Sequence, residues 1–207
     1  GRVNLSIEPL RLPGSPTQAI AEALSDAISA KDFAPLPQKF GFVVDTGPAR
    51  VMTDIVGDIR IEGSGANLLV RPTGQDRGAL AQDKGSAVVL ALNLARWFIT
   101  SGAIGADGRG RMAEAMAQGL PLPEDFTANA APNTAKALDM TGPAWIQASG
   151  ETLSPDRLAE AARAAPLHVS PFRALYAPGL APTDHLETPG QRRDNASQPA
   201  HLFSGQA

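Results

Sequence analysis

The chain has 207 residues, of which 43% are hydrophobic and 19% charged, and it carries a formal net charge of −3. A chain of this length can bury a sizeable core as a soluble globular protein, and its negative charge disfavours binding to a nucleic-acid backbone. Because the sequence contains no cysteine, we expect no disulfide, no thiolate zinc site and no iron–sulfur cluster held by this chain alone.

The longest apolar stretch, residues 86–99, contains Asn93 and Arg96 and is too short to span a bilayer. No basic and apolar signal peptide opens the sequence. We therefore expect a cytoplasmic protein that does not enter a membrane.

Residues 14–32 show the clearest helical pattern. Ser15 is a typical N-cap, and Pro16 stands at the first helical position, where its missing N–H costs nothing. Apolar residues then recur at four-residue spacing: Ile20, Leu24 and Ile28. The pattern predicts a helix that packs one narrow stripe on a sheet.

Three extended segments follow, at residues 39–45, 57–63 and 66–72. In the first, one face carries the apolar residues Phe40, Phe42 and Val44. In the second, Ile59 and Ile61 alternate with the charged residues Asp58, Arg60 and Glu62. The glycines around Ser64 would join the last two segments as a hairpin. We expect an antiparallel sheet with one solvent-exposed face.

Helices at about residues 83–100 and 111–118, separated by a glycine-rich stretch, would cover this sheet. Residues 121–142 are rich in Pro, Ala and Asn without periodicity, which indicates a linker or an irregular excursion.

Beyond this linker the pattern predicts a strand at 143–149, a helix at 153–165 capped by Ser154, and a strand at 167–178. Strand, helix and strand in so few residues imply a right-handed parallel crossover, which is half of a ferredoxin-like unit. The tail at 181–207 has lost its apolar pattern, so we expect it to be flexible.

The sequence thus predicts an α+β fold, in which an antiparallel sheet covered by helices is joined to a smaller ferredoxin-like strand–helix–strand lobe. The expected parts are an α+β lobe at 1–120, the linker at 121–142, a half lobe at 143–180 and the tail at 181–207.

Few polar residues form a recognisable catalytic or metal-binding pattern. His168, His185 and His201 lack the spacing of metal ligands, so we expect no metal site. Asp54 and Asp58 stand at the start of an alternating strand, where solvent-facing charges are expected rather than an acid–base pair.

Lys39 lies at a strand entrance in the segment LPQKFGFVVD, residues 36–45. A lysine there is commonly a solvated end of the strand, with its stem on apolar surface and its ammonium in water. The alternative is a cation that belongs to an anion-binding site. The local sequence leaves both interpretations open.

Three segments together resemble a known family. In order, LPQKFGFVVD, then GDIRIEGSGANLLVRPTG at 57–74, then SPFRALYAPGL at 170–180 are similar to landmarks of the precorrin-3B synthases, within the nitrite and sulfite reductase ferredoxin-like superfamily. The opening RVNLSIEPLRL resembles the segment that precedes the family's lysine strand, and the resemblance covers about residues 2–180. It implies a nitrite/sulfite reductase-like fold for the lobe at 1–120.

The resemblance also implies a tetrapyrrole-binding site. Lys39 matches the lysine that faces the tetrapyrrole, and Arg173 matches an arginine of the family's TPWR motif, with Phe172 in place of the tryptophan. A polycarboxylate macrocycle needs several fixed positive charges, so Arg71 is a third candidate. Gly41 stands where siroheme reductases carry a second lysine, which argues against sulfite or nitrite as substrate.

The implied activity is that of an oxidoreductase of aerobic cobalamin biosynthesis, which oxidises precorrin-3A with dioxygen. The family holds an iron–sulfur cluster in a four-cysteine segment that this sequence lacks, and we expect a fragment or a degenerate paralogue that binds no cluster alone. We therefore expect this chain alone to be inactive unless a cysteine-bearing partner chain supplies the cluster. The alternative is a non-catalytic module that binds a tetrapyrrole or a partner.

Overall fold

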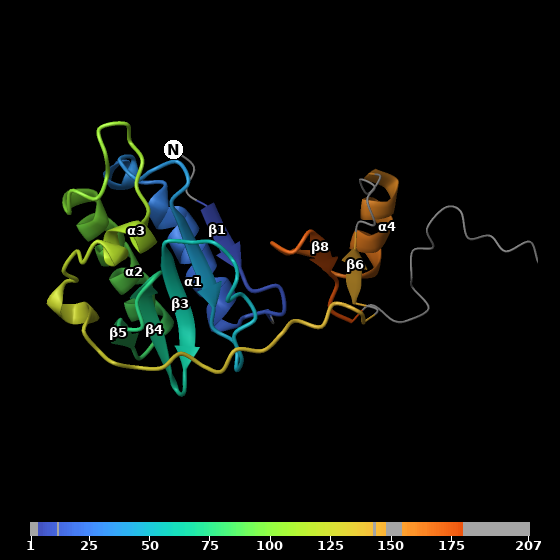
Figure 1. The fold of residues 1–207 in the computed structure, drawn as a ribbon. Coiled ribbons are helices and arrows are strands. Elements are labelled where there is room, and N and C mark those ends of the chain that lie inside the picture. Colours follow the sequence, from blue (N-terminus) through green and yellow to red (C-terminus); the bar gives the residue numbers. More distant parts are fainter. Residues whose placement is uncertain (1–3, 12, 143, 148–154, 180–207) are drawn as a thin grey trace, which may run out of the picture.

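The computed structural model describes residues 4–11, 13–142, 144–147 and 155–179. It contains a five-stranded mixed sheet and a separate three-stranded antiparallel sheet, together with helices, so the fold is α+β (Figure 1). Within these residues no helix has the length and apolar character that crossing a membrane requires.

The larger sheet has its strands in chain order. They are β1 (Asn4–Ile7), β2 (Gly41–Asp45), β3 (Ile59–Ser64), β4 (Asn67–Pro72) and β5 (Ala79–Ala81). β1, β2 and β3 are parallel, whereas β4 and β5 are each antiparallel to the preceding strand. The expectation of an antiparallel sheet is therefore wrong for β2 and β3, because the long connection at 46–58 returns the chain to the same end of the sheet.

The hairpin between β3 and β4 is confirmed. Ser64 pairs with Asn67, so the turn consists of Gly65 and Ala66, and Gly65 has φ 59°. A two-residue hairpin turn with positive φ at its first central position favours glycine there.

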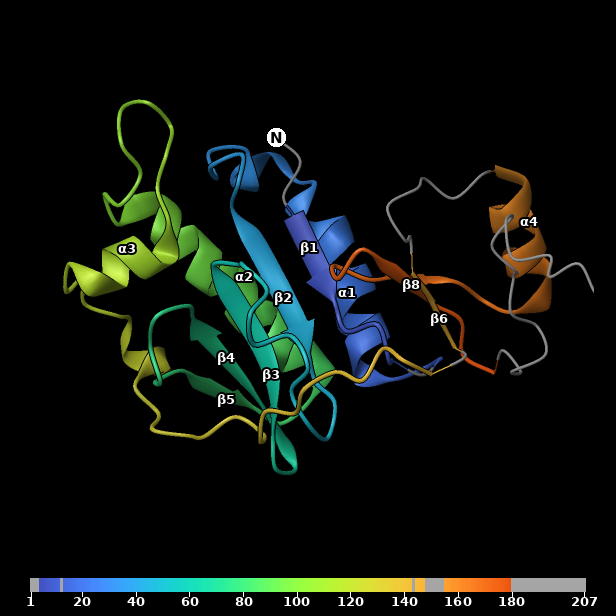
Figure 2. The ribbon, with the colours of Figure 1, turned by 45° about the vertical axis from the view of Figure 1, so that its right-hand side comes forward.

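The helices of this part are α1 (Pro16–Ile28), the short η1 (Lys31–Phe33), α2 (Lys84–Thr100), α3 (Met112–Ala117) and η2 (Glu124–Phe126). Ser15 caps α1 by accepting the Gln18 N–H, as the sequence predicts, and Asp83 forms a capping box with Ser86 at the start of α2. Both long helices contact the same face of the sheet (Figure 2).

The apolar core lies between this helical layer and the sheet. Phe40, Phe42 and Val44 contribute to it from one face of β2, as the alternation predicts. The ring centroids of Phe40 and Phe98 are 5.1 Å apart. Ile20, Leu24 and Ile28 of α1 are buried against it.

The opposite face of the sheet is covered rather than solvent-exposed, so that expectation is wrong. Asp58, Arg60 and Glu62 are 1%, 4% and 0% exposed. The chain at 128–136 runs across this face: the Asn133 N–H donates to Gly63 O at 2.6 Å, and residue 50 pairs with residue 135 in an isolated bridge. Alternation in β3 therefore separates an apolar interior from a buried polar layer.

The smaller sheet has the order β6 (Trp145–Gln147), β8 (Ala174–Tyr176), β7 (His168–Val169). In the chain, β6 comes before the helix α4 (Pro155–Ala164), and β7 and β8 come after it. The single strand expected at 167–178 is wrong, because the chain turns back at 171–173 and forms a hairpin. Both β6 and β7 are antiparallel to β8, so they point in the same direction on either side of it.

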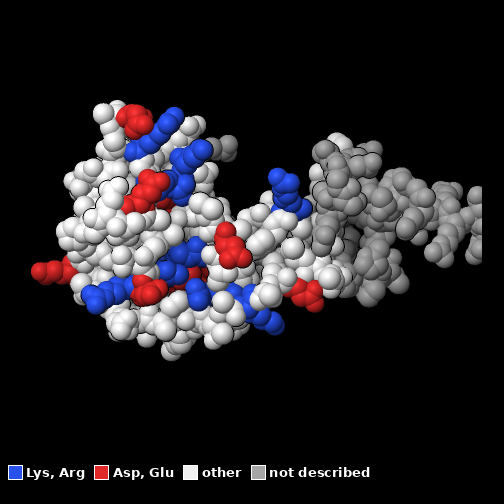
Figure 3. Space-filling model, viewed as in Figure 1, with Lys and Arg blue, Asp and Glu red and all other residues white. Residues whose placement is uncertain are grey.

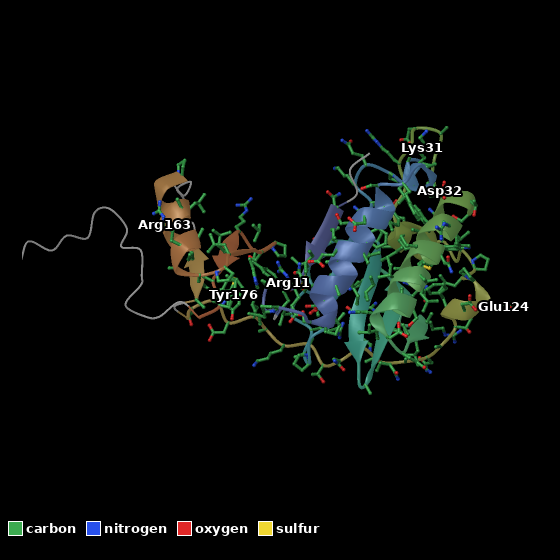
Figure 4. The ribbon with its side chains drawn as sticks, turned by 180° about the vertical axis from the view of Figure 1, so that it is seen from behind. Arg11, Lys31, Asp32, Glu124, Arg163 and Tyr176 are labelled. Atoms are coloured by element: carbon green, nitrogen blue, oxygen red, sulfur yellow. The ribbon has the colours of Figure 1, made fainter. Side chains whose placement is uncertain are left out.

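A contact connects the smaller sheet to the segment that follows β1: His168 Nδ1 of β7 lies 2.7 Å from the Pro9 carbonyl oxygen. Figure 4 shows this junction from behind, with Arg11 on the side of the larger sheet and Tyr176 on the side of the smaller one. The expectations for Ser154, for His185 and His201 and for the tail at 181–207 lie outside the described residues.

Candidate functional site

Lys39 is exposed two residues before β2 and lines a surface hollow of about 790 Å³. The opposite wall of the hollow is the loop between α2 and α3 and the first turn of α3. The charged lining residues are Lys39, Arg109 and Arg111, with the carboxylates Asp107 and Glu114. Figure 3 shows blue and red side chains gathered over this upper end of the molecule.

The loop that carries Arg109 has its own hydrogen bonds. The Gly105 N–H donates to Arg109 O at 2.8 Å, and the Gly108 N–H donates to Gly105 O at 2.9 Å. Arg109 Nε lies 3.7 Å from Asp107 Oδ2, and the two side chains are 89% and 62% exposed. An ion pair this exposed contributes little energy, so the Arg109 guanidinium is available to an incoming anion.

Arg111 is held more firmly. Its Nε donates to Asp58 Oδ1 at 3.0 Å, and the side chain is 28% exposed. Among the described residues, no recorded bond uses the two terminal nitrogens of Arg111. The guanidinium therefore has a fixed attachment and free donors, which is the arrangement that suits a bidentate contact with a carboxylate.

A second charge cluster lies at the other end of the parallel strands and is centred on Glu62, which is fully buried. Glu62 accepts from Arg60 Nε at 2.9 Å and from Arg71 Nε at 2.7 Å, and Arg50 Nη1 lies 3.5 Å away. Burial opposes ionisation of Glu62, but the hydrogen bonds and charges of Arg71 and Arg60 outweigh it and hold the pKa of Glu62 below its usual range.

The arginines of this cluster also connect loops. Arg60 donates to the carbonyl oxygens of Met52 and Ile55, and Arg71 donates to Gln75 O. All three side-chain nitrogens of Arg60 and of Arg71 are thus used within the chain. The cluster stabilises the covering loops and has few donors left for a ligand.

Two more buried carboxyls lie beside this cluster, at the carboxyl ends of β1 and β2. Glu8 is 6% exposed and Asp45 is 0% exposed. Burial and the charge of Asp45 raise the pKa of Glu8 to about 6, and burial also raises the pKa of Asp45. Both groups are closed off from solvent, and burial disfavours their ionised forms, so we assign no ligand contact to them.

The three residues selected from the sequence are not brought together. Lys39 lines the hollow, Arg71 belongs to the Glu62 cluster, and Arg173 is exposed in the hairpin of the smaller sheet with φ 57°. Of the described residues, neither Arg71 nor Arg173 lines the Lys39 hollow. Sequence reasoning missed Arg109 and Arg111, whose only signal was their close spacing in a glycine-rich loop.

The described residues show no metal centre, and the sequence has no cysteine to hold an iron–sulfur cluster. No group of three His, Asp or Glu side chains that could hold a metal is found in the described part of the chain, and the whole sequence lacks cysteine. The side chain of His168 contacts a backbone carbonyl instead. Comparisons with protein-family models, with curated proteins and with solved structures find no match to this chain.

Proposed function

We propose that this chain provides the tetrapyrrole-binding part of a precorrin-3B synthase-like oxidoreductase, and that the Lys39 hollow receives carboxylates of the ligand. The observation that carries the proposal is the position of Lys39. It lies in one of the three segments that resemble the family, and it lines a hollow with Arg109 and Arg111.

The chemistry of the hollow suits an anionic ligand of moderate size. Its volume of about 790 Å³ lies within the usual range of about 300–1,000 Å³ for small-molecule sites. Three cations face two carboxylates in its lining. Lys39 and Arg109 are exposed enough to reorient, whereas Arg111 is held by Asp58. A precorrin-type macrocycle carries several carboxylates, so part of it would sit against these cations while the rest extends beyond the hollow.

The redox step would need groups from outside this sequence. Side chains alone supply no one-electron chemistry, and a cluster of the family's type would need cysteines from outside these 207 residues, which contain none. The same absence favours the second candidate, a non-catalytic module that binds the tetrapyrrole or a partner. In both cases the smaller sheet with α4 would be half of a ferredoxin-like unit.

The test is a titration of the full chain with uroporphyrin, an octacarboxylate porphyrin, followed by fluorescence at low and at high salt. We expect Lys39→Ala to weaken binding by about three- to tenfold at low salt, as removal of one partly solvated charge contact does. The difference should shrink at high salt, because exposed charges are screened.

Lys136→Ala is the matched control, since Lys136 is also exposed but lies in the segment that covers the sheet. Arg71→Ala and Arg173→Ala in the same titration test the other two candidates. The proposal fails if the wild type does not bind uroporphyrin, or if Lys39→Ala and Lys136→Ala bind it equally well. Oxidation of a precorrin after a cysteine-bearing protein has been added to this chain would support the enzyme. Binding without oxidation in the same mixture would support the non-catalytic module.

A further inference from the structure

Asp58 is the most connected carboxylate at the end of the sheet where the hollow lies. Its Oδ2 accepts the Gly41 N–H at 3.0 Å, and its Oδ1 accepts both the Met112 N–H at 2.9 Å and Arg111 Nε at 3.0 Å. The residue is 1% exposed. One buried carboxylate therefore joins the start of β2, the start of α3 and the Arg111 guanidinium.

These partners belong to both walls of the hollow. Gly41 follows Lys39 by two residues, and Arg111 immediately precedes α3. The backbone of Asp58 reinforces the first attachment, because its N–H donates to Gly41 O at 2.7 Å. The wall that contains Arg111 has no described backbone bond to Asp58. Its described attachment to residue 58 is made by the carboxylate alone.

We infer that Asp58 is a positioning residue for anion binding, which fixes the Arg111 guanidinium opposite Lys39 so that both cations engage one polycarboxylate ligand. The inference rests on the proposed function. The Nε contact to Asp58 sets the plane of the guanidinium and leaves both terminal nitrogens without a described partner in a residue that lines the hollow, and a preset plane is what makes an arginine contact bidentate. Without that contact, Arg111 would have to be ordered by the ligand at the time of binding.

Asn at position 58 keeps the shape of the side chain but presents an N–H₂ group to one of three donors. It also removes the charge that holds Arg111. We expect Asp58→Asn to weaken uroporphyrin binding by about tenfold, similar to Arg111→Ala, and the double variant to lose about tenfold rather than a hundredfold, because residues that act as one unit are not additive.

Asp45→Asn is the matched control. Asp45 is 0% exposed and also accepts two backbone N–H groups, from Val51 and Met52, but at the opposite end of β2. Both substitutions remove a buried carboxylate that accepts backbone N–H groups, so a change in thermal unfolding alone does not identify a role in binding. Uroporphyrin affinity does: we expect it to fall in Asp58→Asn and to stay within about twofold of the wild type in Asp45→Asn.

Arg111→Lys keeps the test decisive if Asp58→Asn does not fold. It retains the charge on a partly exposed side chain but lacks the planar donor group, and we expect it to bind as weakly as Arg111→Ala. Wild-type affinity in Arg111→Lys, or additive losses in the double variant, overturns the inference.

The two proposals fail in different ways. Binding that depends on Lys39 but is equal in Asp58→Asn and Asp45→Asn overturns the positioning role alone. A wild type that does not bind uroporphyrin overturns both the positioning role and the proposed function.

Discussion

Replacing Glu8 by Gln should stabilise the protein above pH 7. The Glu8 carboxyl is 6% exposed and lies beside the buried Asp45 at the carboxyl ends of β1 and β2. Burial, followed by the charge of Asp45, raises its pKa from 4.5 to about 6. A rise of that size corresponds to about 2 kcal/mol, since one pKa unit is about 1.4 kcal/mol.

The sign follows from proton binding. Between pH 4.5 and about 6 the folded protein holds more protons at Glu8 than the unfolded chain does, so the free energy of unfolding falls as the pH rises through this window. Above about pH 6, the ionised Glu8 lowers the free energy of unfolding by the full amount of about 2 kcal/mol. Glu8→Gln removes this cost and keeps an oxygen that can accept the Thr17 hydroxyl, whose Oγ1 lies 3.3 Å from Glu8 Oε2.

We expect Glu8→Gln to raise the free energy of unfolding by about 1–2 kcal/mol at pH 8 and to change it little at pH 4.5. Urea denaturation at several pH values measures this difference. Glu22→Gln, on the exposed side of α1, controls for the loss of one negative charge. A change in stability that is the same at pH 4.5 and pH 8 would refute the reasoning.

Two further predictions concern stability. Glu62→Gln should lower the free energy of unfolding by about 3–5 kcal/mol at pH 7, because it leaves buried arginine charges without their counter-charge; a urea midpoint equal to that of Glu22→Gln would contradict this. Arg173→Gly should stabilise the smaller sheet by about 0.5–1 kcal/mol, because φ 57° disfavours a residue with a Cβ. Hydrogen exchange of the β8 amides measures the second effect, and exchange no slower than in Arg173→Ala would count against it.

Elements whose signals are local could be predicted from the sequence. α1 has its cap, its proline and its apolar repeat within one segment, and the structure confirms all three. The helix expected at about residues 83–100, which is α2 in the structure, and the hairpin between β3 and β4 were equally accessible, because the deciding residues are neighbours in the chain.

The direction of β2 relative to β3 could not be predicted in this way. Alternation of apolar and polar residues is the same in parallel and antiparallel strands, so the pattern says which face is apolar but not how strands pair. The connection at 46–58 decides the pairing, and it contains no helix that would have marked it as a crossover. β1 and β5 were not predicted either, because each is short.

The buried polar face was missed for a related reason. Arg60 and Glu62 alternate with isoleucines as solvent-facing residues do, yet they are buried because Arg50, Arg71 and the chain around Asn133 complete their contacts. These partners come from separate segments. A periodic pattern shows that one face is polar, and only the tertiary contacts show whether water or other charges satisfy it.

The two ends of the parallel strands use charge differently. At the carboxyl end, Glu62 is enclosed and the donors of Arg60 and Arg71 are used within the chain, so substitution there should act on stability. At the other end, Lys39 and Arg109 are exposed, and Arg111 is anchored to Asp58. The exposed ion pair of Arg109 with Asp107 contributes little, and the neighbouring cations repel one another, so their unused donors gain most from an added anion. Loss of Lys39 should therefore weaken ligand binding while leaving the fold nearly as stable as before.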